Sequence, residues 1–267
     1  MTDSPKRIVL ITGASGGIGL AAAKLFFAKG DRVYGLSRRP CPEAGIESIC
    51  ADVTDEAAVR NAIKTVIGLE GRLDVLVCNA GFGISGAVEF TADADAKRQF
   101  DVNFFGTSNC IRAALPEMRR QGSGMIIVTS SVAGMLSIPF QAYYSASKAA
   151  LNSLVLATAN EVRPYGVRVA AIMPGDIKTG FTAARTKSNA GSSDYAALSK
   201  SVATMERDEQ NGMSPDVIAR CMYSVSRKRN PKPLRSVGLQ YKACCLLGKF
   251  LPCRLSNWIV GKMYASK

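Results

Sequence analysis

A glycine-rich turn near the N-terminus constrains the fold more than any other segment of this chain. A short apolar run leads into Thr-Gly-Ala-Ser-Gly-Gly-Ile-Gly at residues 12–19, and an apolar helical pattern follows. Gly13 permits a sharp turn, Gly17 lets a ligand approach the backbone, and Gly19 lets a helix pack closely on a strand. The amides and positive dipole at a helix start favour phosphate. The pattern predicts a strand–turn–helix unit that binds a dinucleotide; a tight turn without a ligand is the alternative.

Strand-like and helix-like patterns alternate along the rest of the chain. The expected strands are residues 7–12, 32–37, 46–50, 75–78, 124–129 and 167–173, and the expected helices are 17–29, 55–69, 95–121, 142–164 and 215–226. Several of the strands are continuous apolar runs, which is typical when helices cover both faces of a sheet. The alternation predicts a single-domain α/β fold with a Rossmann-type doubly wound parallel sheet, which binds ligands beyond the carboxyl ends of its strands.

Composition narrows the chemistry and the setting. The chain has 267 residues, 47% of them hydrophobic, which suffices for one large core. Histidine is absent, so histidine triads and histidine metal sites are excluded, and we expect no metal. The eight cysteines include no Cys-x-x-Cys pair, and no apolar run reaches the ~18 residues of a membrane span. With no secretory pattern in the first residues, we expect a reduced, cytoplasmic setting.

A serine, a tyrosine and a lysine have the spacing of an acid–base site. Ser131 precedes Tyr144 by thirteen residues, and Lys148 follows one helical turn later, on the same face as Tyr144. An ammonium beside a phenol favours the phenolate, so we expect the pKa of Tyr144 to move from roughly 10 toward neutrality. Such a tyrosine exchanges protons with an alcohol or carbonyl oxygen. The alternative is a helix that carries Tyr and Lys without any catalytic role.

Five motifs in register make the chain resemble the single-domain branch of the short-chain dehydrogenase/reductase family. They are the glycine turn at 12–19, Cys-Asn-Ala-Gly at 78–81, Asp-Val-Asn-Phe-Phe-Gly at 101–106, the Ser131/Tyr144/Lys148 set and Pro-Gly-Asp-Ile-Lys-Thr-Gly-Phe at 174–181. The resemblance covers residues 6 to about 230. The one departure is Cys78, where the family usually has asparagine. Residues 81–90 look like the segment found in 17β-hydroxysteroid dehydrogenase-like and retinol dehydrogenase-like members.

The resemblance implies roles for individual residues. Tyr144 would be the catalytic acid/base, Lys148 would assist it and hold the nicotinamide ribose, and Ser131 would bind the substrate oxygen. Asn103 would hold a water behind Lys148 as a proton relay. The implied cofactor contacts are Gly13, Ser15, Gly16, Gly17, Ile18, Gly19, Ser37, Arg38, Arg39, Asp52, Val53, Asn79, Ala80, Gly81, Tyr144, Lys148, Pro174, Gly175, Ile177 and Thr179. Purely structural roles for Asn79 and Asn103 are the alternative.

The end of the second expected strand decides the choice of cofactor. Enzymes that use NAD usually carry an acid about twenty residues after the glycines, to bind the ribose hydroxyls. Here Ser37, Arg38 and Arg39 occupy that place, and no acid follows until Glu43. A guanidinium binds phosphate in a fork, so we expect NADP (NADPH), with its 2′-phosphate on Arg38. The alternative is a solvated pair of surface arginines.

The C-terminal segment is basic and apolar, with no acidic residue after Asp216. We expect residues 1–230 to form the cofactor-binding and catalytic domain, and 231–267 a basic helical extension on or near the substrate pocket. Two amphipathic helices, 241–251 and 255–264, would meet at Pro252. Basic amphipathic helices with a tryptophan favour peripheral membrane contact, while a lid and a subunit contact are the alternatives. Nothing in the pattern favours nucleic acid.

Together these patterns predict an NADP-dependent oxidoreductase that interconverts a hydrophobic ketone or aldehyde with its alcohol. Apolar residues at 135–140, before the tyrosine, favour a steroid-, retinoid- or long-chain-like substrate. The family habit implies a homodimer or homotetramer. Two alternatives remain: a non-catalytic NADP-binding regulatory protein, and a sugar-nucleotide epimerase or dehydratase.

Overall fold

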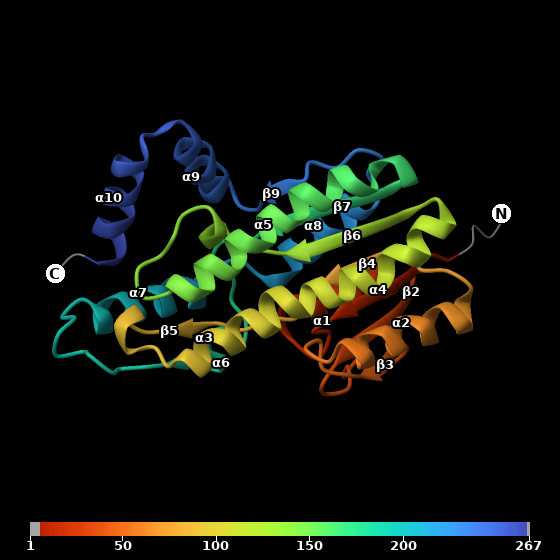
Figure 1. Ribbon diagram of the computed structural model, residues 1–267, viewed down its shortest axis with the longest axis horizontal. Coiled ribbons are helices and arrows are strands. Elements are labelled where there is room, and N and C mark those ends of the chain that lie inside the picture. Colours follow the sequence, from red (N-terminus) through yellow and green to blue (C-terminus); the bar gives the residue numbers. More distant parts are fainter. Residues whose placement is uncertain (1–5, 266–267) are drawn as a thin grey trace.

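The computed structural model describes residues 6–265, and a seven-stranded parallel sheet forms its centre (Figure 1). Across the sheet, the strands are β3 (Glu47–Cys50), β2 (Arg32–Ser37), β1 (Ile8–Thr12), β4 (Val75–Cys78), β6 (Gly124–Thr129), β7 (Val167–Met173) and β9 (Leu234–Ser236). The direction of winding reverses between β1 and β4, which is where a crevice opens beyond the carboxyl ends of a doubly wound sheet. The predicted Rossmann-type fold is confirmed.

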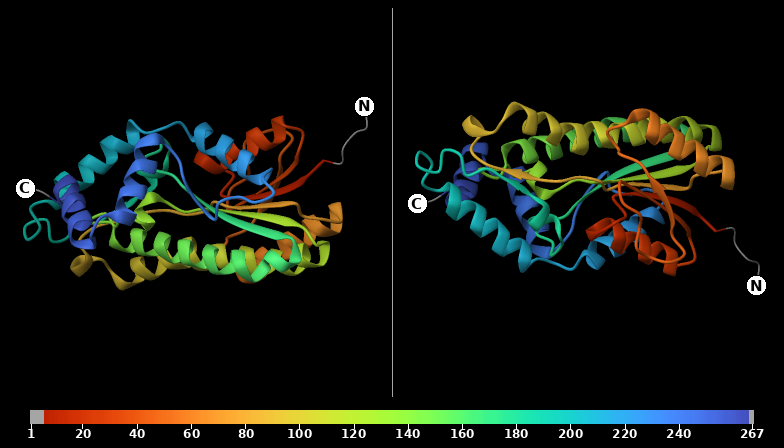
Figure 2. Two further views of the ribbon diagram at one scale, coloured as in Figure 1. Left: turned by 90° about the horizontal axis from the view of Figure 1, so that it is seen from above. Right: turned by 90° about the horizontal axis from the view of Figure 1, so that it is seen from below.

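Helices cover both faces of this sheet, as Figure 2 shows edge-on. One face packs against α1 (Gly17–Ala28) and α8 (Pro215–Ser226), and the other against α2 (Glu56–Glu70), α4 (Gly106–Gln121) and α5 (Ala142–Val162). Successive side chains of a strand point to opposite faces: Val9 and Ile11 belong to the core beneath α1 and α8, and Leu10 belongs to the opposite core. This two-sided burial explains why the strands are continuous apolar runs.

The single helix expected at 95–121 is interrupted. The chain forms α3 (Asp93–Phe100), one π-helical turn (Asp101–Phe105) and then α4. Such π turns occur mostly as single turns inside α-helices and are frequent at functional sites. Here the turn carries Asn103, which is completely buried. The apolar periodicity of the segment continues through the extra residue, so sequence pattern alone does not reveal it.

A second group of small elements extends beyond the carboxyl edge of the sheet. It contains β5 (Ile84–Ser85) paired in parallel with β8 (Thr186–Lys187), and α6 (Phe181–Ala184) and α7 (Leu198–Gln210). Short 3₁₀ turns lie at Val88–Phe90, Val132–Gly134 and Arg163–Tyr165. The turn at Arg163–Tyr165 overlaps the end of the helix expected at 142–164. None of the other elements was predicted, because the short ones lack a period and α7 is mostly polar.

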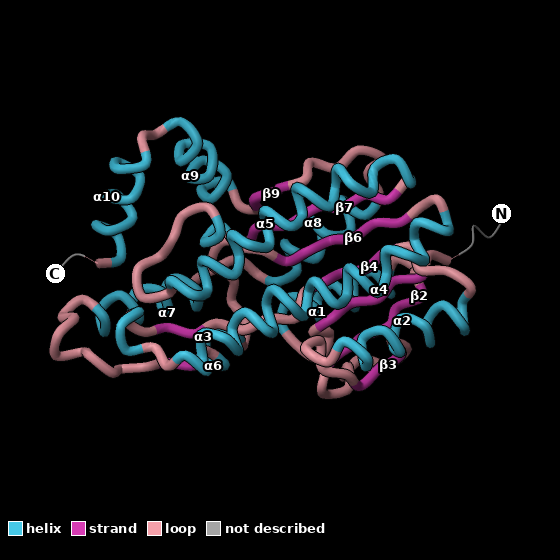
Figure 3. The backbone as a smooth tube through the Cα atoms, in the orientation of Figure 1, coloured by secondary structure: helices cyan, strands magenta, loops and turns pink. Residues whose placement is uncertain are grey.

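The C-terminal segment first joins the sheet and then forms two helices. Strand β9 pairs with β7, so the sheet continues past the boundary expected at residue 230. Helices α9 (Leu239–Phe250) and α10 (Cys253–Tyr264) then meet at Leu251 and Pro252, as predicted (Figure 3). Within residues 6–265, no helix has both the length and the apolar character needed to cross a membrane.

Candidate active site

The turn between β1 and α1 has the conformation that its glycines predicted. Gly13 and Gly17 have φ angles of +70° and +54°, a region that favours glycine. A Cβ atom on Gly19 would lie 2.2 Å from the Gly13 oxygen, so Gly19 lets α1 start close against the turn. Gly16, the N-cap of α1, provides no side chain to cap the first-turn amides. The turn is therefore a backbone cradle suited to phosphate.

Asn79 ties together the carboxyl ends of three strands. Its Nδ2 donates a hydrogen bond to the Thr12 oxygen at 3.2 Å, and its Oδ1 accepts one from Thr129 Oγ1 at 3.1 Å. The Thr12 hydroxyl oxygen accepts the backbone N–H groups of Asn79 and Ala80, both at 2.9 Å. These bonds hold the 79–81 turn beside Gly13. The predicted contact of Asn79 with a cofactor stays a prediction.

Tyr144 and Lys148 face the carboxyl end of β6 from the first turns of α5. The Lys148 Nζ atom lies 5.7 Å from the centre of the Tyr144 ring and donates a 2.8 Å hydrogen bond to the Thr129 oxygen. The Lys148 side chain is buried, while Tyr144 is half-buried in the wall of a cleft. The helical spacing read from the sequence thus places the phenol and the ammonium together.

Ser131, rather than its neighbour Ser130, is available to a substrate oxygen. The Ser130 hydroxyl donates to the Lys148 backbone oxygen at 3.1 Å, which fixes it against α5. The Ser131 oxygen accepts from the Ala133 N–H at 3.1 Å, an arrangement that leaves the hydroxyl proton to be donated. Ser131 is also close enough to Tyr144 to lower that tyrosine's pKa, against the effect of burial. The structure therefore brings Ser131, Tyr144 and Lys148 into one group.

Burial affects the protonation of Tyr144 and Lys148 more than the electrostatic interaction between them does. Burial raises the pKa of Tyr144 to about 12, and the hydrogen bond with Ser131 acts in the opposite direction. Burial also lowers the pKa of Lys148 from 10.5 to about 8. The expectation that Lys148 moves the pKa of Tyr144 toward neutrality is wrong, because desolvation disfavours both charged forms. At pH 7, Tyr144 keeps its proton and most Lys148 side chains are charged.

Asn103 stands behind this group without lining the cleft. Its Oδ1 accepts the Phe82 N–H at 3.0 Å, and its Nδ2 donates to the Phe82 oxygen and to Ser147 Oγ, both at 3.1 Å. These bonds connect the π turn to α5 and to the segment after β4. A structural role for Asn103 is therefore visible, and its role in a proton relay stays a prediction.

Arg38 and Arg39 follow β2 at the opposite end of the cleft. Ser37 Oγ donates to the Arg39 backbone oxygen at 2.7 Å, which shapes the turn that carries both arginines. Both side chains are exposed, and neither forms an ion pair with a carboxylate among residues 6–265. Two guanidinium groups without acidic partners, beside a phosphate cradle, fit a ligand with an additional phosphate.

One cleft of about 940 Å³ joins the glycine turn, the arginines and the Ser–Tyr–Lys group. All the predicted site residues line it except Gly19 and Asn103. They are Gly13, Ser15, Gly16, Gly17, Ile18, Ser37, Arg38, Arg39, Asp52, Val53, Asn79, Ala80, Gly81, Ser131, Tyr144, Lys148, Pro174, Gly175, Ile177 and Thr179. Residues separated by more than 160 positions in the sequence thus form a single surface.

The sequence reading missed several residues of the same cleft. Arg98, Gln141, Asp176, Phe181 and Glu209 also line it, and the Phe181 ring lies 5.8 Å from that of Tyr144. Asp176 and Phe181 belong to the motif at 174–181, so that motif could have revealed them. Glu209 lies on the unpredicted helix α7 and carries no signal of its own in the sequence.

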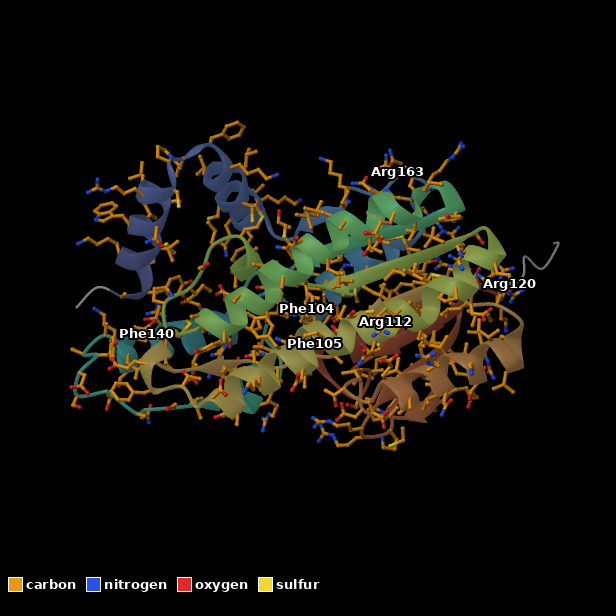
Figure 4. The ribbon with its side chains drawn as sticks, in the orientation of Figure 1. Phe104, Phe105, Arg112, Arg120, Phe140 and Arg163 are labelled. Carbon is orange, nitrogen blue, oxygen red and sulfur yellow. The ribbon has the colours of Figure 1, made fainter. Side chains whose placement is uncertain are left out.

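The loop before α5 limits the cleft at the end away from the arginines. Phe140, labelled in Figure 4, has a φ of +60°, an unusual value for a bulky residue and often a sign of functional constraint. Its backbone oxygen accepts the Gly86 N–H at 2.9 Å, and its ring packs edge-on against Tyr195. Of the apolar stretch 135–140 expected along the pocket, Ile138 lines the cleft.

Helix α9 reaches back to this end of the cleft. The Tyr241 hydroxyl donates a 2.6 Å hydrogen bond to Asp176 Oδ2, and its ring covers Gly175 so closely that a Cβ there would lie 2.2 Å from it. Gly248, two turns further along α9, faces Leu136. The C-terminal extension therefore packs against the loop that begins at Pro174 and lines the cleft, and its predicted place on the substrate pocket stays a prediction.

Comparison with known proteins agrees with this geometry. The sequence pattern of the family described as short chain dehydrogenase matches residues 7–190. The chain belongs to the short-chain dehydrogenase family. A relative in Bacteroides thetaiotaomicron, 3-ketodihydrosphingosine reductase, is 39% identical over 97% of this chain and 98% of its own. Human 17-beta-hydroxysteroid dehydrogenase type 1 is 38% identical over 66% of this chain and 58% of its own.

Solved structures of the family show the same architecture. A short-chain dehydrogenase from Streptomyces avermitilis superposes with a TM-score of 0.84 at 30% identity, covering 97% of each chain. ElxO with NADP bound superposes with a TM-score of 0.75 at 26% identity, covering 90% of this dehydrogenase and 100% of ElxO. The resemblance inferred from the motifs is thereby confirmed. The individual cofactor contacts and the homodimer or homotetramer stay predictions.

Proposed function

We propose that this dehydrogenase uses NADPH to reduce a hydrophobic ketone to its alcohol. The observation that carries the proposal is one cleft with Arg38 and Arg39 at one end and Ser131, Tyr144 and Lys148 at the other. Relatives named for a ketosphingoid base and for a hydroxysteroid support a hydrophobic substrate, and a similar structure with NADP bound supports the cofactor.

The chain's own residues fit the two ends of this cofactor. The cradle at Gly13 and Gly17 receives the pyrophosphate, and Arg38 receives the 2′-phosphate. The 174–181 loop and Lys148 hold the nicotinamide end beside Tyr144. NADPH, when bound, supplies a hydride.

Tyr144 acts as the general acid in the direction of reduction. Because burial holds its pKa at about 12, the phenol is protonated at neutral pH and donates its proton to the carbonyl oxygen as that oxygen becomes an alcohol. Ser131 donates a hydrogen bond to the same oxygen while negative charge develops on it. The ammonium of Lys148 then stabilises the tyrosinate that remains.

The exposed surface of the two C-terminal helices supports a lipid-like substrate. Phe250 and Trp258 are 80% and 60% exposed. Other exposed large apolar or basic residues of α9 and α10 are Leu239, Leu246, Leu247, Leu255, Ile259, Met263, Lys242, Lys249, Arg254 and Lys262. From residue 217 to the last residue the chain has eleven Lys or Arg and no Asp or Glu. Apolar and cationic groups together complement an anionic bilayer, so we propose that this surface contacts lipid.

The direct test is NADPH consumption by the purified full-length protein. The probes are a long-chain 3-ketone, a 17-ketosteroid and retinal. We expect turnover of at least one of them, with NADPH preferred over NADH. NADPH binding without turnover of any ketone or aldehyde would overturn the proposal and favour the non-catalytic regulator.

A further inference from the structure

Asp176 lines the cleft at the end where a substrate carbonyl would react. It follows Gly175 in the loop after β7 and is half-buried. Its Oδ2 accepts the 2.6 Å hydrogen bond from Tyr241, and no lysine or arginine forms an ion pair with it among residues 6–265. A carboxylate that lacks a cation in such a place is costly unless a ligand provides one.

The other carboxylate at this end is already neutralised. Glu209 forms an ion pair with Arg185, whose side chain is only 1% exposed, and accepts a 2.6 Å hydrogen bond from Thr182. Both Asp176 and Glu209 are near enough for their charges to raise the pKa of Tyr144. Of the two, Asp176 is the one that forms no ion pair among residues 6–265.

We propose that Asp176 binds an ammonium group on the substrate, next to the ketone, so that the preferred substrate is a long-chain amino ketone. This inference rests on the proposed reduction of a hydrophobic ketone. The Tyr241 hydroxyl holds one carboxylate oxygen, and the other is left to accept a charge-assisted hydrogen bond from the ammonium. Asp176 and Tyr144 line the same cleft, and the charge of Asp176 acts on the phenol of Tyr144, so an ammonium bound at Asp176 would belong to a substrate whose amine is near its carbonyl.

Burial supports the same assignment. It raises the pKa of Asp176, whereas the Tyr241 hydrogen bond lowers it. The charged form thus lacks full compensation from the protein. A bound ammonium would provide the missing positive charge. A neutral ketone would leave the carboxylate unpaired, so the site would disfavour it relative to an amino ketone.

The test compares two probes that differ only in charge, a long-chain 2-amino-3-ketone and its N-acetyl derivative. We expect wild-type kcat/KM to be roughly 10- to 100-fold higher for the amine, the range of a hydrogen bond to a charged group. Asp176→Asn keeps an acceptor for Tyr241 and should lose that preference, because kcat/KM should fall further for the amine than for the N-acetyl probe. Asp208→Asn, which removes a neighbouring charge outside the cleft lining, should retain the preference.

Two results would overturn the inference, and they are distinguishable. Equal wild-type kcat/KM values for both probes would reject the ammonium site and leave ketone reduction intact. An equal loss on both probes in Asp176→Asn, with an unchanged melting temperature, would assign Asp176 a general role instead. Turnover of neither probe nor of any other ketone would reject the proposed function itself. The wild-type comparison requires no variant, so a misfolded Asp176→Asn does not remove the test.

Discussion

The hydroxyl of Tyr241 on α9 donates a 2.6 Å hydrogen bond to Asp176 in the loop after β7. This bond joins the last part of the chain to the loop that the family motif places at the nicotinamide end. The basic extension is therefore tied to a loop that lines the cleft. Because β9 also belongs to the sheet, the segment cannot be removed at residue 230 without taking a strand with it.

Arg38 should determine the preference for NADPH. We expect Arg38→Ala to lower the ratio of kcat/KM for NADPH to that for NADH by about 10- to 100-fold, because a charge-assisted contact with phosphate is lost. Arg220→Ala removes an exposed arginine of α8 outside the cleft lining and serves as the matched control. An unchanged ratio in Arg38→Ala would assign that arginine to the solvated surface.

The charge of Lys148 should set the alkaline limit of activity. Its pKa of about 8 means that the ammonium is present below pH 8 and is lost as the pH rises through that value. We therefore expect kcat/KM for NADPH, which reports ionisations of the free enzyme, to fall above about pH 8. Tyr144, with a pKa of about 12, stays protonated across this range. A flat profile from pH 6 to pH 10 would contradict this assignment.

The ion pair of Glu209 and Arg185 should stabilise the substrate end of the fold. Glu209→Gln leaves a guanidinium with a 1% exposed side chain unpaired, and we expect a loss of about 3–5 kcal/mol in the free energy of unfolding. Its neighbour Asp208 pairs with the exposed Arg207 at 3.1 Å, so Asp208→Asn should cost no more than about 1 kcal/mol. Urea denaturation of both variants measures the difference. Equal effects would show that the buried pair contributes little.

The sequence predicts the strands of the sheet. It predicts fewer of the residues and elements around the proposed substrate site. The continuous apolar runs at β1, β4, β6 and β7 come from strands buried on both faces, and each of these strands was predicted. The π turn at Asp101–Phe105 was not predicted, because one extra residue leaves the apolar pattern nearly unchanged. The pKa of Tyr144 was predicted in the wrong direction, because helical spacing reveals a neighbour and not the depth of burial.

Contacts across long sequence distances account for the remaining omissions. Tyr241 lies 65 residues from Asp176 in the sequence, and no local sequence pattern predicts the hydrogen bond between them. Glu209 becomes part of the cleft only because α7 folds back beside α6. Such contacts depend on how loops close over the sheet, which local propensity does not determine.

The exposed surface of α9 and α10 should bind anionic membranes. We expect the full-length protein to float with vesicles that contain anionic phospholipid, and less so at high salt, because the attraction of basic residues is screened. The paired substitution Phe250→Ser and Trp258→Ser should reduce flotation several-fold. The pair Leu69→Ser and Val88→Ser, which removes exposed apolar groups elsewhere, should not. A change in oligomeric mass with unchanged flotation would assign the surface to a second copy.

The most direct measurement is the rate of NADPH-dependent reduction of a long-chain ketone by Tyr144→Phe. Loss of the proton donor should lower kcat by about 10²- to 10⁴-fold, the usual contribution of general acid catalysis. Tyr143→Phe, which alters the adjacent residue, should retain wild-type activity. A Tyr144→Phe protein that reduces the ketone at the wild-type rate would contradict the proposed mechanism.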